Sequence, residues 1–434
     1  MTVGITLTDE SVIRSWLLSD DGDLISEVSK FCEVVIFCKQ SHKDLIANFI
    51  ENNLETSNRV TVKPLEEFKE NTFQKILGFV MRYSEKSDGN LVLIRRMKDK
   101  NQISGFDYLL RISVHNIMVN FPKLIILFRA LYQFLPNKKY KKILELFEVK
   151  LLLCASISNF IYDSEIMRAA KKLSIKTLGT PRGWDNLVSH GYLRVIPDVF
   201  FSHSHFMTNC AIQNQLIEKK TIIPMGTSTY QEYLIPNRQD LFVKKRIAIG
   251  CVGPRSNPTE SIFIDEFLTI ATEAFPYFEF VIIQHPKFPH LVNFDYKNTS
   301  QATFEYSKAN GSLKKYYNYL SSFDLLLTSG SSIGLDALFV GTPVHCFFID
   351  LIDTGYWESS ARYLSHRPHY RELIQKLEIP VHDSINSIIK ILHQIEKGEK
   401  PPAPTPTFFT GFPDFDFKDI LLSCLKKYLI HSKL

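Results

Sequence analysis

Short apolar runs alternate with stretches of helical period along most of this chain. Runs of four to eight apolar residues are typical of buried strands, whereas apolar residues three and four positions apart are typical of amphipathic helices. Because strands that alternate with helices form parallel sheets covered by helices, the pattern predicts an α/β fold. The predicted strands are residues 3–7, 33–37, 60–62, 149–155, 175–178, 197–203, 221–224, 246–250, 278–283, 324–328 and 344–349, and the helices between them include one over 65–82.

Two stretches interrupt this alternation. Residues 108–146 are helical throughout, with breaks at Pro122 and Pro136, and predict a helical insertion in the first half. Residues 225–243 have no strong period, and the chain is too long for one ordinary core, so we place a domain junction there. The predicted division is a Rossmann-like domain over 1–230, a second Rossmann-like domain over 244–415, and a C-terminal helix over 416–434 that packs back across the junction.

Composition narrows the class of protein. The 434 residues are 45% hydrophobic and 22% charged, with a formal net charge of +5, which is typical of a soluble globular protein. This mild charge comes without any RNP, zinc-finger or helix-turn-helix pattern and gives no argument for nucleic-acid binding. The seven cysteines are odd in number and include no C-x-x-C pair, so we expect buried reduced thiols in a cytoplasmic protein.

No segment predicts a membrane crossing. The N-terminus lacks the basic and apolar regions of a secretion signal. The apolar stretch 121–135 contains Lys123 and Arg129 and is shorter than the ~20 residues that a spanning helix needs. The basic cluster 138–142 beside it is either a solvated helix face or, with the rest of 121–142, a patch for peripheral association with the inner face of the cell membrane or a lipid-linked substrate.

Polar, glycine-containing loops follow three predicted strands of the second half. The most informative stretch is 323–344, which reads as a strand, a small-residue turn, a helix and a second strand. Because ligands of such sheets bind at the carboxyl ends of the strands, and helix starts bind anions, we expect a phosphorylated ligand here. The residues predicted to hold it are Gly253, Arg255, His285, Pro286, Lys287, Ser329, Gly330, Ser331 and Ser332, with Asp336 accepting from a ribose hydroxyl. The structural alternatives are a core histidine at 285 and a helix cap at the serine turn.

Three short motifs carry a family resemblance. His285-Pro286 after a strand, Ser331-Ser332 before a helix and the helix stop at 341–343 resemble GT-B-fold glycosyltransferases of bacterial surface-polysaccharide synthesis. The bacterial sialyltransferases and capsule Kdo transferases of that fold are the most similar types. The resemblance covers the fold across most of the chain, and it implies that the first domain binds the acceptor and the second binds the nucleotide sugar. It also implies that the His-Pro and Ser-Ser pairs contact the cytidine monophosphate of a CMP-sugar.

An inverting transferase needs one carboxylate to take the proton from the attacking acceptor hydroxyl. Asp185 lies on a loop after a first-half strand and is the first candidate, and Asp9 and Glu10 after the first strand are the next. The structural alternatives are a turn residue for Asp185 and a helix N-cap for Asp9. Asp20-Asp21-Gly22 fits the letters of the family's acidic motif but follows a helix rather than a strand. The residues predicted to bind the acceptor are Arg182, Trp184 and Asn186.

We predict no metal and no cofactor, because no Asp-x-Asp follows a predicted strand and no His/Cys ligand spacing is present. The expected activity is inverting, metal-independent transfer of a sugar to a surface glycan or a lipid-linked acceptor. A CMP-activated acidic sugar is the first candidate donor and a UDP-sugar the second. A nucleotide-sugar 2-epimerase and a non-catalytic, GT-B-like sugar-nucleotide-binding protein remain the alternatives.

Overall fold

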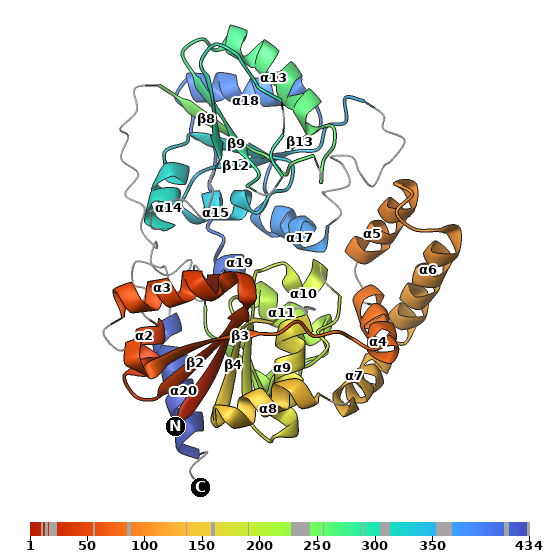
Figure 1. Cartoon of the computed structure of the whole chain (residues 1–434). Helices are drawn as coiled ribbons and strands as arrows, with labels where there is room; N and C mark the ends of the chain where they lie inside the picture. The colour runs from red at the N-terminus through yellow and green to blue at the C-terminus, as the bar shows by residue number, and fades with distance from the viewer. Residues whose placement is uncertain are drawn as a thin grey trace. The chain divides into compact units, whose positions relative to one another are not determined.

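The structure is a computed structural model of the whole chain (Figure 1). It describes residues 1–431 apart from 10–11, 14–15, 17–23, 55–56, 85–87, 136, 158–160, 190, 227–243, 255, 287, 291, 304–312, 353–366 and 412–415. The chain forms two compact units: the first contains Met1–Leu91, Leu109–Glu232 and Phe408–Leu434, and the second contains Val92–Tyr108 and Tyr233–Thr407.

The first unit is built on a seven-stranded sheet in the order β3-β2-β1-β4-β5-β6-β7. Every strand pair described in it is parallel. The strand order diverges between β1 and β4, since β2 and β3 lie on one side and β5 to β7 on the other. The bounds are β1 (Thr2–Leu7), β2 (Glu33–Lys39), β3 (Val60–Leu65), β4 (Val149–Ile157), β5 (Lys176–Pro181), β6 (Val199–Ser202) and β7 (Ile222–Pro224).

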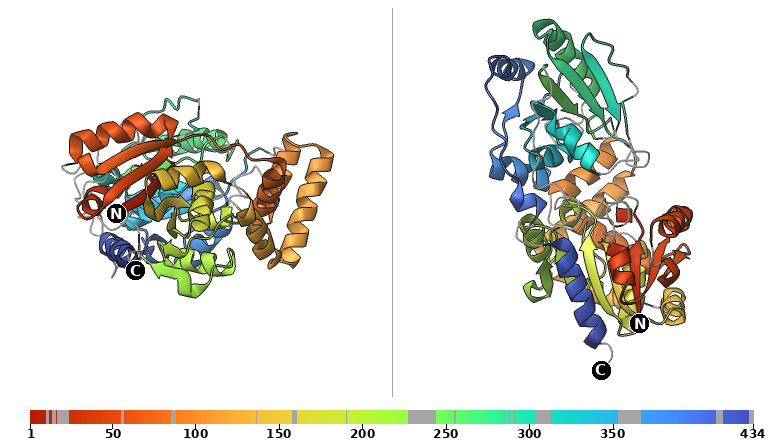
Figure 2. Two further views of the ribbon diagram at one scale, coloured as in Figure 1. Left: turned by 60° about the horizontal axis from the view of Figure 1, so that its bottom comes forward. Right: turned by 90° about the vertical axis from the view of Figure 1, so that its left-hand side faces the viewer.

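Helices cover both faces of this sheet (Figure 2). On one face, α2 (Leu24–Ser29), α3 (Lys43–Asn53) and α20 (Phe417–His431) share an apolar core with β1, β2 and β4. Side chains alternate along a strand, so Thr6 of β1 points to the other face, where it donates to Asp163 of α9 (Ile161–Lys172). Leu421 and Leu425 of α20 are fully buried, which confirms that the C-terminal helix packs back on the first sheet.

The helical insertion predicted over 108–146 lies between β3 and β4 and is longer than predicted. It consists of α4 (Thr72–Tyr83), α5 (Asp88–Asp99), α6 (Gly105–Asn120), α7 (Leu124–Phe134) and α8 (Lys138–Leu146). The start of the helix predicted over 65–82 is wrong. Strand β3 continues to Leu65 beside β2, and α4 begins only after Asn71, which forms a reciprocal capping box with Gln74.

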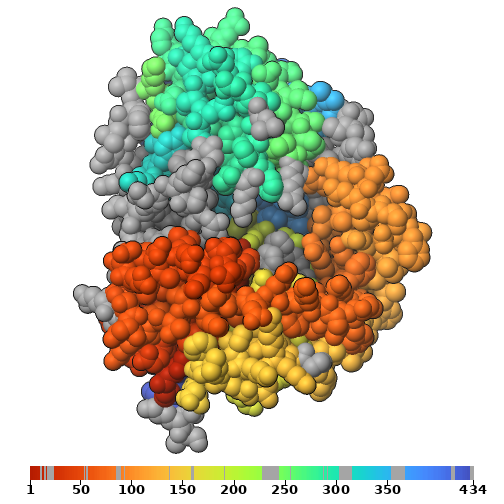
Figure 3. Space-filling model, viewed as in Figure 1, coloured from red at the N-terminus to blue at the C-terminus, as the bar shows by residue number. Residues whose placement is uncertain are grey.

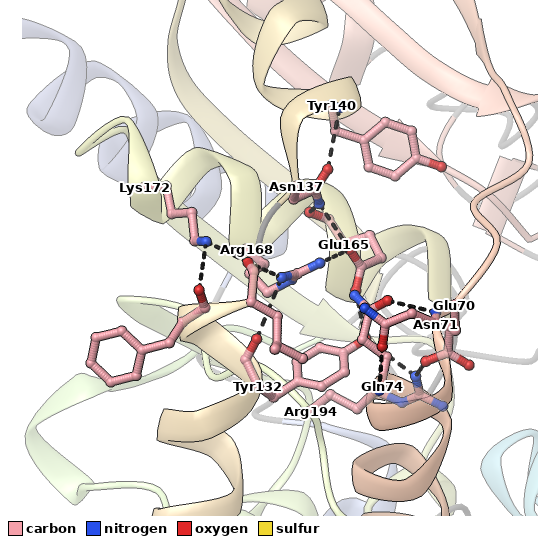
Figure 4. A network of polar contacts seen from close by, with 12 residues as sticks. Glu70, Asn71, Gln74, Tyr132, Asn137, Tyr140, Glu165, Arg168, Lys172 and Arg194 are labelled. Carbon is pink, nitrogen blue, oxygen red and sulfur yellow. Dashed lines mark hydrogen bonds and ion pairs between the residues drawn. The ribbon is translucent and has the colours of Figure 1, made fainter.

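A buried polar network attaches this insertion to the sheet (Figure 4). The Glu165 carboxylate of α9 accepts from the Tyr132 hydroxyl at 2.5 Å, from Asn137 Nδ2 at 2.8 Å and from the Arg168 guanidinium. Arg194 donates to Glu70 and, at 3.2 Å, to the same Tyr132 oxygen. Because a buried charge is costly unless it is paired, these contacts fix α7 and the start of α8 against α9.

The second unit contains a six-stranded sheet in the order β10-β9-β8-β11-β12-β13. Its bounds are β8 (Arg246–Gly250), β9 (Glu279–Gln284), β10 (Thr299–Thr303), β11 (Leu325–Thr328), β12 (Val344–Phe347) and β13 (Val381–His382). The apolar pattern did not predict β10 or β13. Both are edge strands, β10 is mostly polar and β13 has two residues, so neither gives an apolar run. The two parallel sheets confirm the predicted pair of Rossmann-like domains.

Helices also pack on the second sheet. The helices α13 (Glu260–Ala274) and α18 (Ile385–Glu396) share an apolar core with the middle strands. Three further helices belong to this unit: α14 (Leu313–Ser321), α15 (Ile333–Phe339) and α17 (Pro368–Leu377). The first residue of α13, Glu260, is fully buried.

Two histidines meet at the β13 edge of the second sheet. Nδ1 of His345 lies 2.9 Å from Nε2 of His382, whose Nδ1 lies 2.9 Å from the Ser387 hydroxyl. Burial, together with the neighbouring His382, lowers the pKa of His345 from its usual 6.5 to about 4. In the unfolded chain His345 binds a proton as the pH falls below about 6.5, whereas in the folded chain it binds one only near pH 4. Because the unfolded state binds more protons between these values, folding stability is lost as the pH falls through this window.

We predict that the free energy of unfolding in urea falls between pH 6.5 and 4, with at most about 3 kcal/mol of the fall caused by His345. The variant His345→Gln cannot be protonated there and should flatten the pH dependence. The control His393→Gln replaces an exposed histidine of α18 and should leave the slope unchanged. Equal slopes for His345→Gln and the unmodified chain would show that this residue does not cause the pH dependence.

Candidate functional site

The three polar loops of the second half follow adjacent parallel strands. In the sheet β8 lies between β9 and β11, so the loops after Gly250, Gln284 and Thr328 leave the same edge side by side. The strand order diverges between β8 and β11, with β9 and β10 on one side and β12 and β13 on the other. Crevices at such points bind the ligands of open α/β sheets.

A single buried carboxylate holds these loops together. Glu260 is 0% exposed and accepts from the backbone N–H groups of Val252 and Gly253 at 3.0 and 2.9 Å. It also accepts from the Ser329 hydroxyl at 2.6 Å, and Nε2 of His290 lies at 2.8 Å. As the first residue of α13 it benefits from the positive end of the helix dipole. One side chain thus joins the loops after β8, β9 and β11.

Gly253 allows two of these loops to touch. Its φ of +76° lies in the left-handed region, and a Cβ there would come within 2.3 Å of the Phe288 carbonyl oxygen. Any other residue would therefore push the β8 loop away from the β9 loop. The predicted importance of Gly253 thus has a structural basis in close backbone approach.

Hydrogen bonds with neighbouring residues fix the serine turn after β11. The Thr328 hydroxyl accepts from the N–H of Ser331 at 3.1 Å and donates to the Gly250 carbonyl at 2.9 Å. The Ser331 carbonyl accepts from the Tyr370 hydroxyl of α17. Ser329 is fully buried and its hydroxyl is directed at Glu260. Ser329 therefore supports the turn, whereas Ser331 is half-buried and Ser332 is exposed.

His285 is held in a defined tautomer. Its Nδ1 accepts from the backbone N–H of Phe288 at 3.2 Å, and the two rings lie 5.3 Å apart. Because Nδ1 accepts, the neutral ring carries its proton on Nε2. The half-buried ring is thus a hydrogen-bond donor after β9, while the exposed Pro286 continues the loop.

The structure places the other residues predicted to bind the phosphorylated ligand as follows. The Asp336 carboxylate of α15, predicted to accept from a ribose, accepts from the Tyr316 hydroxyl at 3.0 Å. Gly330 has a φ of 114°, which a glycine adopts readily. Ser332 precedes α15 without a side-chain capping bond, so the helix-cap alternative does not describe its hydroxyl. Arg255 and Lys287 lie outside the described residues.

Cys251, Glu260 and His290 form a buried group whose ligand-type atoms lie within 4.8 Å of one another. Burial, followed by the Glu260 charge, raises the pKa of the Cys251 thiol well above its usual value, and metals bind the thiolate. The Glu260 oxygens already accept the hydrogen bonds described above. The group therefore acts as a hydrogen-bonded support. Sequence reasoning missed Glu260, because an acidic residue in a first helical turn is usually an exposed charge.

In the first unit two predicted residues from distant parts of the chain meet. Arg182, on the loop after β5, donates to the Asp9 carboxylate after β1 at 2.8 Å. The two side chains are 24% and 18% exposed. Asp9 was predicted as a base and Arg182 as an acceptor-binding residue, and the ion pair joins them. Glu10 and Asp20-Asp21-Gly22 lie outside the described residues.

The polar side chains of the loop that contains Asp185 form hydrogen bonds within the loop and with α10. The Asp185 carboxylate accepts from the Ser189 hydroxyl at 3.0 Å, across the short helix α10 (Asn186–Ser189). The Asn186 side-chain oxygen accepts from the Gly183 N–H at 2.6 Å. Trp184 packs against Phe206 of α11 (His205–Gln213) and Phe409 of α19 (Thr407–Thr410), with ring centroids 5.8 and 5.9 Å away. These contacts favour the structural alternative for Asp185, and they give the Trp184 ring packing partners within the first unit.

A second buried carboxylate lies where the first sheet diverges. Asp163 is fully buried and accepts from the hydroxyls of Thr6 at 2.6 Å, Thr8 at 2.7 Å and Ser156 at 3.1 Å. Burial raises the pKa of the Asp163 carboxyl, and the three hydroxyl donors oppose this shift. Asp163 thus joins the ends of β1 and β4. Sequence reasoning did not predict this role of Asp163.

Comparison with known proteins supports the fold. No protein-family model and no curated protein matches the chain. Among solved structures, a UDP-N-acetylglucosamine 2-epimerase from Rickettsia bellii has a TM-score of 0.52 at 10% identity and covers 99% of this chain and 97% of its own. The UDP-GlcNAc 2-epimerase from Methanocaldococcus jannaschii has a TM-score of 0.51 at 11% identity, with 98% and 100% covered. The enzyme from Neisseria meningitidis bound to UDP-GlcNAc has a TM-score of 0.50 at 14% identity, also with 98% and 100% covered.

At these identities the likeness shows the fold alone, which is the predicted two-domain, Rossmann-like GT-B fold. None of the three structures is a sialyltransferase or a Kdo transferase, so that narrower resemblance stays a prediction.

Replacement of Glu260 should destabilise the second unit. Glu260→Gln keeps the size of the side chain but places an NH2 group among donors. We expect the free energy of unfolding to drop by about 3 kcal/mol, the typical cost of breaking a buried charged contact. Glu273→Gln on the exposed side of the same helix is the matched control and should change it by less than about 0.5 kcal/mol. Urea denaturation measures both, and equal stability of the two variants would contradict the supporting role of Glu260.

Proposed function

We propose that this chain is a nucleotide-sugar enzyme that binds the phosphates of its substrate at the loops after β8, β9 and β11. The observation that carries this proposal is the Glu260 contact set, which joins those three loops at the point where the second sheet diverges. A buried carboxylate with these partners holds the loops in one geometry, and preorganised loops at this edge are what an anionic ligand requires.

The exposed groups of these loops suit phosphate. Nε2–H of His285 and the hydroxyls of Ser331 and Ser332 are donors, which phosphate oxygens accept. The described residues within 251–259, 285–290 and 329–332 carry no acidic side chain. The site therefore favours a ligand that brings negative charge.

The reaction class is open between two candidates, and the comparisons favour 2-epimerisation over glycosyl transfer. All three solved structures named above are UDP-N-acetylglucosamine 2-epimerases, and one of them is bound to UDP-GlcNAc. This supports a UDP-sugar as the first substrate to test, ahead of the CMP-sugar predicted from the short motifs.

The first unit favours glycosyl transfer through Asp9. In that reaction an acceptor oxygen forms a bond to the anomeric carbon, its proton passes to the carboxylate, and the bond to the leaving phosphate breaks with the electron pair on the phosphate. Arg182 donates to the Asp9 carboxylate at 2.8 Å and so fixes its position, as the geometry of a proton acceptor requires. A surface glycan or a lipid-linked molecule is the proposed acceptor.

A nucleotide screen tests the phosphate site. UDP, CDP, CMP and GDP are added separately, and we expect one of them to raise the melting temperature, because a ligand stabilises the fold by RT ln(1 + [L]/Kd). The variants His285→Ala and Ser332→Ala should weaken binding of that nucleotide at least about tenfold, the effect of losing one charge-assisted hydrogen bond. His393→Ala on the same unit is the control and should bind as the unmodified chain does. No shift with any nucleotide would reject the proposed substrate class.

A substrate assay separates the two reactions and the two candidate bases. UDP-GlcNAc and a set of other nucleotide sugars are followed by NMR: an epimerase produces a new nucleotide sugar, whereas a transferase releases nucleotide slowly as water replaces the acceptor. We expect Asp9→Asn to lower the observed rate by about 100-fold or more. Asp185→Asn should retain most of it, because that carboxylate binds its own loop. The reverse ranking would return the role of base to Asp185.

A further inference from the structure

Helix α7 buries one face and exposes large apolar residues on the other. Ile125, Arg129 and Tyr132 are buried and face the rest of the first unit. Large apolar residues three and four positions apart lie on the opposite side and are exposed: Leu124, Leu127, Leu131 and Phe134. Leu127 is 54% exposed and Phe134 is 82% exposed. A helix that packs on a domain normally buries its apolar stripe and exposes a polar one, so this outer stripe is unusual.

Helix α6 continues the same pattern up to the corner between the helices. Its buried side chains are His115 and Met118. Leu109, Leu110, Ile117 and Phe121 lie on the other side at helical spacing and are exposed, Phe121 by 63%. The α6 stripe ends at Phe121 and the α7 stripe begins at Leu124, so the two exposed stripes meet at this corner. We call these eight residues of α6 and α7 the outer stripe.

The helices α6 and α7, which carry the outer stripe, lie at the edge of the first unit (Figures 1 and 2). The space-filling view shows part of the insertion, in orange, as a broad stretch of surface (Figure 3). Large apolar residues scattered singly over a surface need no explanation, but a contiguous set marks a docking surface.

The stripe cannot turn inward, because α7 is held by polar contacts on its inner face. Arg129 donates to the carbonyl oxygens of Leu193 and Gln215, both at 2.8 Å, and to the Gln215 side chain at 3.2 Å. Rotation of α7 would break these bonds and leave a guanidinium buried without partners, which is costly. The exposure of Leu127 and Phe134 is therefore built into the fold.

The charge of the segment that carries the stripe is mainly positive. From α6 to α8, residues 105–146 contain seven Lys or Arg side chains and two acidic ones, Asp107 and Glu145. Lys123, Lys138 and Lys142 are exposed, whereas Lys139 and Lys141 pair with Glu66 and Glu145. An apolar surface flanked by exposed lysines complements the anionic headgroups and the acyl boundary of a bilayer.

We propose that the outer stripe of α6 and α7, with the lysines beside it, docks the protein on the surface of an anionic lipid bilayer. No single described helix has the length and apolar character to cross a membrane, and α6 and α7 reach them only as a pair bent by 112°. Two such helices lie in the interface, with Phe121, Leu127 and Phe134 among the inserted side chains.

A second copy of this chain fits the surface less well. In a two-fold symmetric dimer the same patch meets itself, so the lysines of one copy would face those of the other without an acidic residue from 109–144 to compensate. Like charges disfavour that contact, whereas anionic lipid removes the repulsion.

Vesicle flotation of the full chain tests the proposal. Vesicles of phosphatidylcholine alone are compared with vesicles that also contain phosphatidylglycerol. We expect binding to the anionic vesicles, with weaker binding at high salt. The double variant Leu127→Glu/Phe134→Glu should lose binding. Lys138→Glu/Lys142→Glu should weaken it by about tenfold or more, since each lysine near the surface contributes about 1 kcal/mol.

Two controls keep the test specific. Tyr277→Glu changes an exposed aromatic residue of the second unit, and Lys219→Glu/Lys220→Glu changes two exposed lysines elsewhere in the first unit; both should bind vesicles normally. Size-exclusion chromatography is run on every variant. A dimer that Leu127→Glu/Phe134→Glu dissociates, or anionic-vesicle binding that this variant retains, would overturn the proposal. Since these variants should bind nucleotides normally, the result is independent of the nucleotide screen.

Discussion

The second unit depends on the burial of one charge. Glu260 is removed from water at the start of α13, and its oxygens must therefore find hydrogen-bond donors within the protein. Those donors come from the loops after three adjacent strands: backbone N–H groups after β8, His290 after β9 and Ser329 after β11. Once the carboxylate is buried, none of the loops can move away without leaving it unsatisfied. The position of the exposed groups of His285 and Ser332 follows from this requirement.

The first unit meets the same problem in the same place. Asp163, in the first turn of α9, is buried where β1 and β4 diverge, and hydroxyls from both strand ends donate to it. Divergence of the strand order opens a crevice at the carboxyl edge of a sheet. In both sheets a buried acid from the following helix accepts hydrogen bonds at this edge and joins the strand ends or loops there. Asp9 lies just after β1, and its partner Arg182 follows β5.

The helical insertion combines a polar inner face with an apolar outer one. Glu165, Arg168 and Arg129 supply buried charges whose partners lie on several elements, and these contacts fix α7 in one orientation. A helix fixed by apolar packing alone could turn its exposed leucines toward the core, since any apolar face would serve. Polar contacts have direction, and here they hold Leu127 and Phe134 at the surface. The same physical rule, that buried charge demands specific partners, thus orders both the loops and the insertion.

The sequence by itself determined the α/β class, eleven of the thirteen described strands, a helical insertion and the return of α20, because each rests on an apolar period that is local in the chain. The mostly polar β10 and the two-residue β13 give no such period and were missed. Only the tertiary structure decided which polar residues of these loops are exposed and which support the fold. Ser329 and Ser332 look alike in sequence, yet one is buried on Glu260 and the other is exposed. The partners of Glu260 and of Asp9 lie far away along the chain, and hydrogen bonds between distant residues leave no periodic signal.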